Sequence, residues 1–429
     1  MNIIVAVIVL GVIIIVHELG HFLLAKKNGI TVTEFSVGMG PRIASFVKNG
    51  TRYSLKAFPI GGSCMMLGED EAIEDEGAFH KKGVWARFSV IFAGAFFNFL
   101  LAFILALIVL GTNGVDLPKV TRVEAGTPAA QAGLKEGDLI TGIDGNKINI
   151  SREIDFYLYF NQLTDRPISI TYLRDGAHKT ISATPKKVST YLLGCRYNGD
   201  NSAASLVQVA SDYPLGQAGV AVGDVIVAID GTNVSSGLEL SDYFKDHPLG
   251  DKPVTVTYQR NGAESTVSVT PKLYTNTELG FGYQTWSEKV SALNVVKYSF
   301  YELKYNINMA IKGVWYLISG RVSVKEVSGP VGIVNVMDQI VSQTESYGIG
   351  IVLLNLASFS ILLSANLGVM NLLPIPALDG GRLVFLVIEA IRRKPVPKEK
   401  EAMVHMIGMA ALMIFMVFIL FNDIKRIFG

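Results

Sequence analysis

The polar sequence His17-Glu18-Leu19-Gly20-His21 lies inside an otherwise apolar stretch, residues 1–25, that contains no Lys, Arg or Asp. A helix of that length is about 37 Å long and can cross a hydrocarbon core of about 30 Å. Helical spacing puts His17 and His21 on one face, where both imidazoles can bind one zinc ion, with Glu18 beside them as a base. Because ionisable groups cost about 2.5–3.5 kcal/mol each on membrane insertion scales, they usually serve a function. The stretch therefore predicts a membrane helix with a metal site; a structural cluster of hydrogen bonds between helices is the alternative.

Composition indicates a membrane protein with a large soluble part. Of the 429 residues, 50% are hydrophobic and 17% are charged, which is too apolar for an ordinary soluble protein and too polar for a helical bundle throughout. The formal net charge of +1 gives no reason to expect nucleic acid as a partner. Cys64 and Cys195 fall on opposite sides of the membrane in the topology described next, so both are expected to be packing residues.

Basic residues give an orientation to four apolar stretches that are long enough to cross a bilayer. The stretches are residues 1–25, 88–110, 349–373 and 403–421. The connections after the first and third stretches are rich in Lys and Arg, which places them in the cytoplasm, although the first also carries an acidic run at 69–76. Both termini and the middle section are then expected on the outer side. The histidines and the glutamate inside the first stretch argue against a cleaved signal peptide.

The middle section contains an internal repeat. A shift of 86 residues, without a gap, makes 25 of the 59 positions from Pro128 to Lys186 identical to those from Pro214 to Lys272. Each copy has a helical step that ends at a glycine, a G-D-x-I-x-x-I-D-G strand and turn, a helix and two alternating strands. This order resembles a PDZ domain, which binds an extended peptide as an added strand, and predicts domains at 115–190 and 200–274. Two closed copies that bind nothing are the alternative.

A catalytic zinc site needs a third protein ligand besides His17 and His21, and a carboxylate commonly completes such a set. Asp379 is the candidate. It follows Pro374 and Pro376 at the end of the third apolar stretch and precedes two glycines, so the backbone can turn there at membrane depth if it lines a cavity.

Two other titratable residues near the membrane ends are expected to be structural. Glu389 lies on a smoother helical run, where Arg392 or Arg393 at a spacing of three or four can pair with it. His405 opens the fourth apolar stretch and is expected to be an interfacial histidine, not a ligand.

Together these features resemble the bacterial site-2 proteases over nearly the whole chain. The resemblance rests on the H-E-L-G-H motif, the sequence N-L-L-P-I-P-A-L-D-G-G from Asn371 to Gly381, the four spans and the tandem PDZ pair. It implies a polytopic α-helical membrane protein of the bacterial inner membrane, with two inserted α+β PDZ domains and a re-entrant β element. The N-terminal membrane half would be 1–110, with the re-entrant region at about 30–66, and the C-terminal half 349–429.

The resemblance also implies roles for single residues. Zn²⁺ would be bound by His17, His21 and Asp379, with Glu18 as the catalytic base. The substrate-binding residues would be Asn371, Asn98 and the segment Val37, Gly38, Met39 and Gly40. One departure is visible: the second span of the family usually carries G-P-x-x-N, whereas this chain has Ala95 in place of the proline, which affects helix shape more than chemistry.

The substrates that the resemblance implies are single-span membrane proteins cut within the bilayer. They include an anti-sigma factor already trimmed outside, in a sigma-E type envelope stress response, and remnant signal peptides. The PDZ pair would act as a periplasmic size filter, and residues 287–330 suit a pair of amphipathic helices at the outer interface. The competing hypothesis is a non-catalytic scaffold that captures chain ends and holds zinc structurally. A structural site would be closed by four protein ligands, and the sequence offers three candidates.

Overall fold

The computed structural model describes residues 2–69, 73–324 and 327–428, which form two compact units. The membrane unit is Met1–Pro118, Ile148–Phe156 and Gln284–Gly429, and the repeat unit is Lys119–Lys147 and Tyr157–Tyr283. Parts of four expected features lie outside the described residues: position 1 of the first apolar stretch, 70–72 of the acidic run, 325–326 of the interfacial segment and 429 of the C-terminal half.

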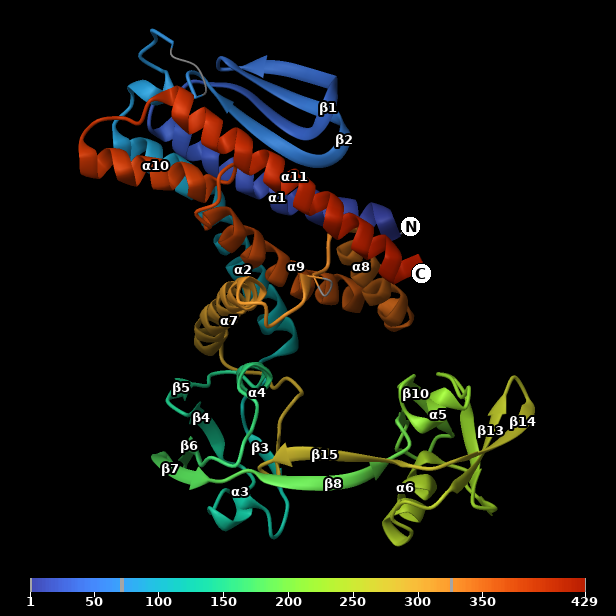
Figure 1. Cartoon of the computed structure of the whole chain (residues 1–429). Helices are drawn as coiled ribbons and strands as arrows, with labels where there is room; N and C mark the ends of the chain where they lie inside the picture. The colour runs from blue at the N-terminus through green and yellow to red at the C-terminus, as the bar shows by residue number, and fades with distance from the viewer. Residues whose placement is uncertain (1, 70–72, 325–326, 429) are drawn as a thin grey trace. The chain divides into compact units, whose positions relative to one another are not determined.

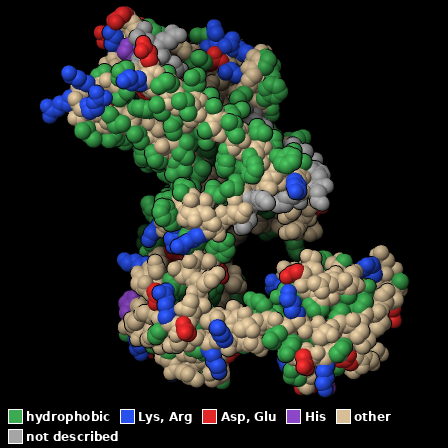
Figure 2. Space-filling model, viewed as in Figure 1, with side chains coloured by type: hydrophobic (Ala, Val, Ile, Leu, Met, Phe, Trp, Pro, Cys, Tyr) green, Lys and Arg blue, Asp and Glu red, His purple; other side chains and the backbone are tan. Residues whose placement is uncertain are grey.

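Within the described residues, four helices of the membrane unit are long and apolar enough to cross a bilayer, as the sequence predicted. They are α1 (Asn2–Lys27), α2 (Val84–Asn113), α9 (Ile349–Leu372) and α11 (Lys398–Phe428). Helix α2 packs against α1 and α9 and thus holds the bundle together, while α11 contacts α8 (Pro330–Thr344) (Figure 1). Hydrophobic side chains cover much of the visible surface of this unit, as lipid contact requires (Figure 2).

The segment before α8 forms one helix, α7 (Ala292–Ile318), and not the expected pair. No proline interrupts residues 292–318, so the helix continues until Ser319, after which Gly320 adopts a φ of 69°. A glycine in this left-handed conformation commonly ends a helix. The helix is amphipathic, with exposed Leu293, Phe300 and Trp315 on one side and buried Glu302 on the other.

Two long bent strands, β1 (Val32–Lys48) and β2 (Thr51–Met66), form an antiparallel sheet within the membrane unit. Gly38 and Gly40 bend β1, and Gly61 bends β2, each with a φ between 83° and 95°. As a result, residues 34–37 pair on one side with 52–55 and on the other with 62–65. Residues 62–66 therefore form one edge of this sheet, and 42–48 form the other.

The repeat unit consists of two similar sets of strands and helices. The first copy contains β3 (Val120–Val123), α3 (Pro128–Gln131), β4 (Leu139–Ile143), β5 (Asn146–Lys147), α4 (Arg152–Phe160), β6 (Ile168–Arg174) and β7 (Ala177–Ala183). The second contains β10 (Ala204–Val209), α5 (Pro214–Gln217), β11 (Val225–Ile229), β12 (Thr232–Asn233), α6 (Gly237–Asp246), β13 (Val254–Arg260) and β14 (Ala263–Val269). The first half of α4 belongs to the membrane unit.

The second copy is inserted into the first. Strand β8 (Lys186–Leu192) leads to β9 (Cys195–Tyr197), which pairs with β10 of the second copy. After β14, strand β15 (Lys272–Glu278) runs back antiparallel to β8, and β16 (Phe281–Tyr283) pairs with β3 of the first copy. The first copy thus needs β16, which lies beyond both sequence-derived domain ranges.

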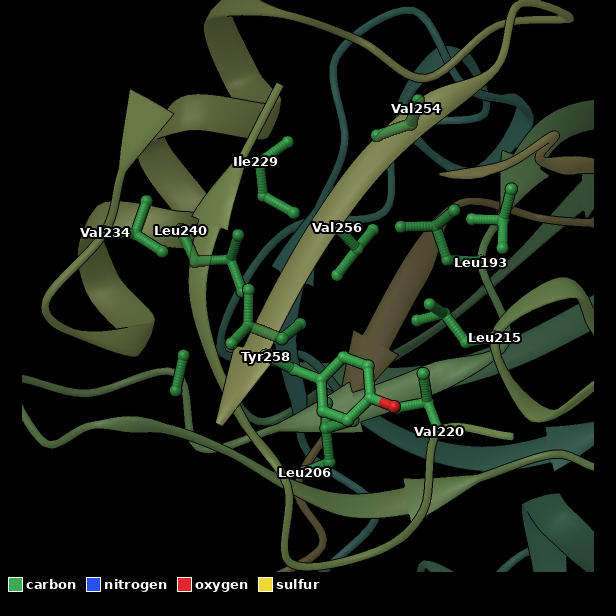
Figure 3. Packing of buried hydrophobic residues seen from close by; sticks show 13 residues of the cluster. Leu193, Leu206, Leu215, Val220, Ile229, Val234, Leu240, Val254, Val256 and Tyr258 are labelled. Atoms are coloured by element: carbon green, nitrogen blue, oxygen red, sulfur yellow. The ribbon is translucent and has the colours of Figure 1, made fainter. Parts of the chain in front are cut away.

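Each copy has its own hydrophobic core. In the second copy, Leu206, Leu215, Ile229 and Leu240 are almost fully buried and point toward one another between the sheet and α6 (Figure 3). The alternating pattern of β13, with Val254 and Val256 inward, provides the other wall of this core.

Candidate zinc site

Three side-chain atoms from two distant parts of the chain converge inside the membrane unit. His17 Nε2 lies 3.2 Å from His21 Nε2 and 3.2 Å from Asp379 Oδ2, and His21 Nε2 lies 3.4 Å from the same carboxylate oxygen. Ligands held at about 2.0–2.1 Å in a tetrahedral zinc site are about 3.3 Å apart. The spacing of the three atoms therefore suits one face of a zinc-sized tetrahedron, and no other His, Cys, Asp or Glu of the described residues joins this group.

Small residues let α1 and α2 approach closely enough to bury both imidazoles. A Cβ added at Gly94 would lie 2.4 Å from His21 Nε2 and 2.6 Å from His17 Cε1, and one at Gly20 would lie 2.4 Å from the carbonyl oxygen of Ala93. Gly20 and Gly94 thus allow the two helices to approach closely beside the histidines. Helix α2 is unbroken around Ala95, which suits the missing proline.

A tight loop presents Asp379 to the histidines. Helix α9 ends at Leu372, and α10 (Asp379–Arg392) begins with the aspartate itself. A Cβ at Gly380 would lie 2.1 Å from the carbonyl oxygen of Leu373, and one at Gly381 would lie 2.5 Å from that of Ile375. The two glycines after Asp379 are therefore needed for the loop to fold back against the first turn of α10.

Hydrogen bonds on the far side of each imidazole leave Nε2 free to bind a metal. His21 Nδ1 donates to the carbonyl oxygen of Val90 at 2.9 Å. His17 Nδ1 lies 3.2 Å from the amide of Asn98, which is fully buried and whose Oδ1 has no hydrogen-bond partner among the described residues. Turning this amide by 180° lets Oδ1 accept the Nδ1–H of His17, which satisfies both groups. Asn98, expected to contact substrate, thus contacts a candidate metal ligand.

Glu18 lines a cavity of about 250 Å³ together with the three convergent residues. The cavity also includes Gly62, Ser63 and Cys64 of β2, and a Cβ at Gly62 would lie 3.1 Å from Glu18 Cγ. The edge of the β1–β2 sheet therefore passes the candidate base. The sequence reasoning missed these three residues, although the Gly61-Gly62 pair was a signal for close approach of backbone.

The other expected substrate-binding residues lie at different distances from the cavity. The amide nitrogen of Asn371 lies 3.4 Å from both ring nitrogens of His17, so it faces the candidate metal site. Val37 pairs with Gly62 and Met39 pairs with Phe58, so this segment lies behind the edge that lines the cavity.

Two residues expected to be structural make bonds that the sequence did not indicate. Glu389 pairs with Arg87 of α2, through hydrogen bonds of 2.6 and 3.1 Å, and so the expected partners Arg392 and Arg393 were wrong. The reason is that α10 packs on α2, which sequence spacing cannot reveal. His405 accepts a hydrogen bond from the backbone N–H of Ala377, in the loop before Asp379.

Comparisons with known proteins agree along the whole chain. Residues 5–415 match peptidase family M50. Zinc metalloprotease RasP of Geobacillus kaustophilus is 33% identical over 98% of this chain and 97% of its own. Regulator of sigma-W protease RasP of Bacillus subtilis is 32% identical over 98% of both chains.

Among solved structures, the HtrA3 PDZ domain bound to a phage-derived ligand aligns with 21% of this chain and 93% of its own. The alignment has 19% identity and a TM-score of 0.18, which is too low to establish a shared fold. The family match and the full-length relatives decide the matter: this chain belongs to peptidase family M50, the site-2 proteases, and is a zinc metalloendopeptidase.

Proposed function

We propose that the chain cuts single-span membrane proteins within the bilayer, with zinc bound by His17, His21 and Asp379. The observation that carries the proposal is the convergence of the three ligand atoms at distances of 3.2–3.4 Å beside Glu18, on a helix apolar enough to span a membrane. Three protein ligands leave one position open, as catalytic zinc sites do, whereas structural sites are closed by four.

The chain's own residues supply the proton transfers and the binding of the peptide. Zinc, when bound, acts as a Lewis acid on the attacking water and the scissile carbonyl. Glu18 takes a proton from that water and later returns it to the leaving nitrogen. Asn371, which faces His17, can bind substrate backbone because its amide both donates and accepts hydrogen bonds.

The β1–β2 sheet gives the unwound substrate a backbone partner. A transmembrane helix must unwind before it is cut, and its freed N–H and C=O groups then need replacement partners in the membrane. The edge at residues 62–66 lines the cavity beside Glu18, so a substrate strand added there lies next to the candidate base. Exposed Met39, Ile43, Phe46 and Phe58 on this sheet support its insertion into the membrane as a re-entrant element.

Charge supports the proposed membrane orientation, and the relatives support the proposed substrate class. Lys and Arg in the connections after α1 and α9 support a cytoplasmic position for these connections, and we infer that the termini and the repeat unit face outward from the inner membrane. The Bacillus subtilis relative is a regulator of sigma-W protease, which supports an anti-sigma factor as one substrate. The two repeat copies are proposed as PDZ domains that exclude substrates with large outer domains.

The zinc site is tested with four purified variants and tagged single-span substrates. Asp379→Ala and His21→Ala should hold well below one zinc per chain, while Glu389→Gln, which keeps a hydrogen-bond acceptor for Arg87, should hold zinc as the unchanged protein does. Glu18→Gln should keep zinc and bind uncut substrate but slow cutting by about 10²–10⁴-fold, the usual contribution of a positioned base. Full zinc in Asp379→Ala would remove the third ligand from the proposal. Cutting at the normal rate by Glu18→Gln would remove the mechanism.

The proposed size-filter role of the two repeat copies is tested by removing them between two chain segments that lie next to each other. Val115 and Glu288 are paired, so residues 119–283 can be replaced by a short Gly-Ser linker between neighbouring chain segments. Because the excision removes Arg152, the partner of buried Glu302, the variant should also carry Glu302→Gln. The excision also removes residues 148–156 of the membrane unit, which hold no proposed ligand. The rest of that unit should still cut and should accept substrates with bulky outer domains. A folded, zinc-bound variant that cuts nothing would show that the repeats assemble the site.

A further inference from the structure

Helix α11 touches the loop that carries Asp379 at one polar point. The Nδ1 atom of His405 accepts a hydrogen bond from the backbone N–H of Ala377 at 2.8 Å. The side chain of His405 is only 16% exposed, and its ring lies 5.6 Å from that of Phe385 on α10. His405 therefore lies between α11, α10 and the loop, and none of the roles proposed above involves it.

The residue that His405 holds has an unusual backbone conformation. Ala377 has a φ of 77°, a region that residues with a Cβ rarely adopt and that costs them about 1 kcal/mol or more. Within the loop, Ile375 N–H donates to Leu373 and Leu378 N–H donates to Ile375. The bond to His405 adds a contact from outside the loop at the position where the backbone is least favourable, two residues before Asp379.

A second contact on α11 brings the helix backbone against the same loop. A Cβ added at Gly408 would lie 2.3 Å from Cβ and 2.7 Å from the carbonyl oxygen of Pro376. Gly408 is three residues from His405, so both face the loop from one side of α11. The close approach at Gly408 places the His405 ring within hydrogen-bonding distance of Ala377.

The bond requires one particular form of the imidazole. Nδ1 must be unprotonated to accept the Ala377 N–H, so the ring proton is on Nε2. Nε2 lies 4.0 Å from Glu401 Oε1, one turn earlier on α11, and this carboxylate favours a proton on that side.

We propose that His405 is a positioning residue for the zinc site. By holding Ala377 in its left-handed conformation, it fixes the Asp379 carboxylate against His17 and His21. The proposal rests on the assignment of Asp379 as a ligand. The sequence motifs around the zinc site do not include α11, so His405 would add the fourth membrane helix to the elements that shape the metal centre.

The experiment compares three variants of the full-length protein in detergent. His405→Phe keeps a ring against Phe385 but removes the acceptor, while His405→Asn keeps an acceptor oxygen close to the place of Nδ1. Met409→Leu, at an exposed position of the same helix, is the matched control. The readouts are the rate of zinc release to a chelator and the visible spectrum after cobalt replaces zinc, because cobalt absorption reports on the ligand geometry.

The expected result separates positioning from general stability. His405→Phe should release zinc faster and alter the cobalt spectrum, with an upper limit of about 10–100-fold, the loss typical when a hydrogen bond to a metal ligand itself is removed. His405→Asn and Met409→Leu should behave like the unchanged protein. Zinc release by His405→Phe at the normal rate would overturn the proposal, as would equal loss in His405→Phe and His405→Asn. If Asp379→Ala retained zinc, the ligand assignment would fail first, so the two failures are distinguishable.

Discussion

The two copies of the repeat agree in the bonds that hold each sheet together and differ in the helix. In the first copy, Arg174 Nε and Nη2 donate to Asp138, each at 2.5 Å; in the second, Arg260 does the same to Asp224 at 2.7 Å. Each arginine also donates to a glycine carbonyl at the equivalent position, Gly133 or Gly219. These bonds lie within one copy, so duplication preserved them in both.

The helices are stabilised in different ways. On α4, Arg152 pairs with Asp116 at 3.1 Å and with Glu302 of α7, and both acids belong to the membrane unit. The equivalent position on α6 is Leu238, which is exposed. Helix α6 has a serine cap: the Ser236 Oγ accepts the N–H of Glu239 at 3.2 Å. The first half of α4 is therefore held by ion pairs inside the membrane unit, while α6 is held by contacts within its own copy.

The largest loss of stability is expected from breaking the arginine–aspartate pair that both copies share. Asp138→Ala and Asp224→Ala each remove a buried carboxylate that accepts hydrogen bonds from an arginine and from a backbone N–H, so each should destabilise its copy. Arg174 is 20% exposed and Arg260 is 44% exposed, so solvent compensates more in the second copy and Asp138→Ala should cost more. Hydrogen exchange of β4 and β11, read by mass spectrometry, measures both losses. A larger loss in the second copy would contradict this ranking.

A smaller loss of stability is expected when Arg152 of the first copy is replaced by leucine, the residue type at the equivalent position of the second copy. Arg152→Leu removes charged hydrogen bonds from buried Glu302, each of which contributes about 1.5–3 kcal/mol. Amide exchange in α4 and α7 should rise by about 10–100-fold, while Leu238→Arg should leave α6 unchanged. Equal protection before and after Arg152→Leu would show that apolar contacts, such as that between Phe156 and Tyr305, are enough to attach α4.

The second copy should also lose stability in acid. Hydrogen bonds from Arg260 hold the pKa of Asp224 below its usual value. A carboxyl group whose pKa is lower in the folded state contributes stability above its unfolded pKa, about 3.9, and loses it as the pH falls further. Protection of β11 should therefore be constant above about pH 5 and decline below about pH 4. In Asp224→Asn that decline should be weaker.

The helix cap predicts a loss of about 1 kcal/mol. Ser236→Ala removes the acceptor for the Glu239 N–H, and such caps contribute about 0.5–2 kcal/mol. The equivalent residue of the first copy is Ile150, a buried residue of the membrane unit whose apolar side chain cannot accept a hydrogen bond. Exchange in the first turn of α6 should rise about fivefold while the first turn of α4 is unaffected. An unchanged exchange rate in the first turn of α6 would mean that the Ser236 cap does not stabilise this helix.

The smallest change in stability is expected from replacing a glycine of the first copy by the alanine that the second copy has at the equivalent position. Gly142 of β4 corresponds to Ala228 of β11, and a Cβ at Gly142 would have its nearest contact at 3.4 Å. Gly142→Ala should therefore alter stability by less than about 1 kcal/mol, with the sign favouring alanine because glycine loses more entropy on folding. The thermal unfolding midpoint of the full chain measures this. A clear loss would mean that the two sheets are less alike than their register suggests.

The sequence predicted those features that depend on local pattern or on repetition. The four spans follow from runs of apolar residues, and the two copies follow from identity at a fixed shift. His17 and His21 follow from helical spacing. The third convergent residue, Asp379, could be chosen because prolines and glycines mark a loop at the end of a span.

The features that the sequence could not predict join segments far apart along the chain. Glu389 pairs with Arg87, about 300 residues earlier, and no spacing rule connects them. The bond from His405 to Ala377 crosses from one helix to a loop. Pairing of β16 with β3 is hidden because both strands are short and the intervening copy has the same pattern. In each case tertiary packing brings the partners together, and such contacts leave no periodic pattern in the sequence.

Because the second copy is inserted into the first, the two copies can fold in a fixed order during synthesis. A chain made from its N-terminus completes β9 to β14 before β16 exists, so the second copy can fold while the first still lacks a strand. Strand β3 must wait for a partner about 160 residues later, and meanwhile its edge is open to wrong pairing. The ribosome supplies α7 directly after β16, so the first copy becomes complete just as the helix to which Arg152 attaches emerges.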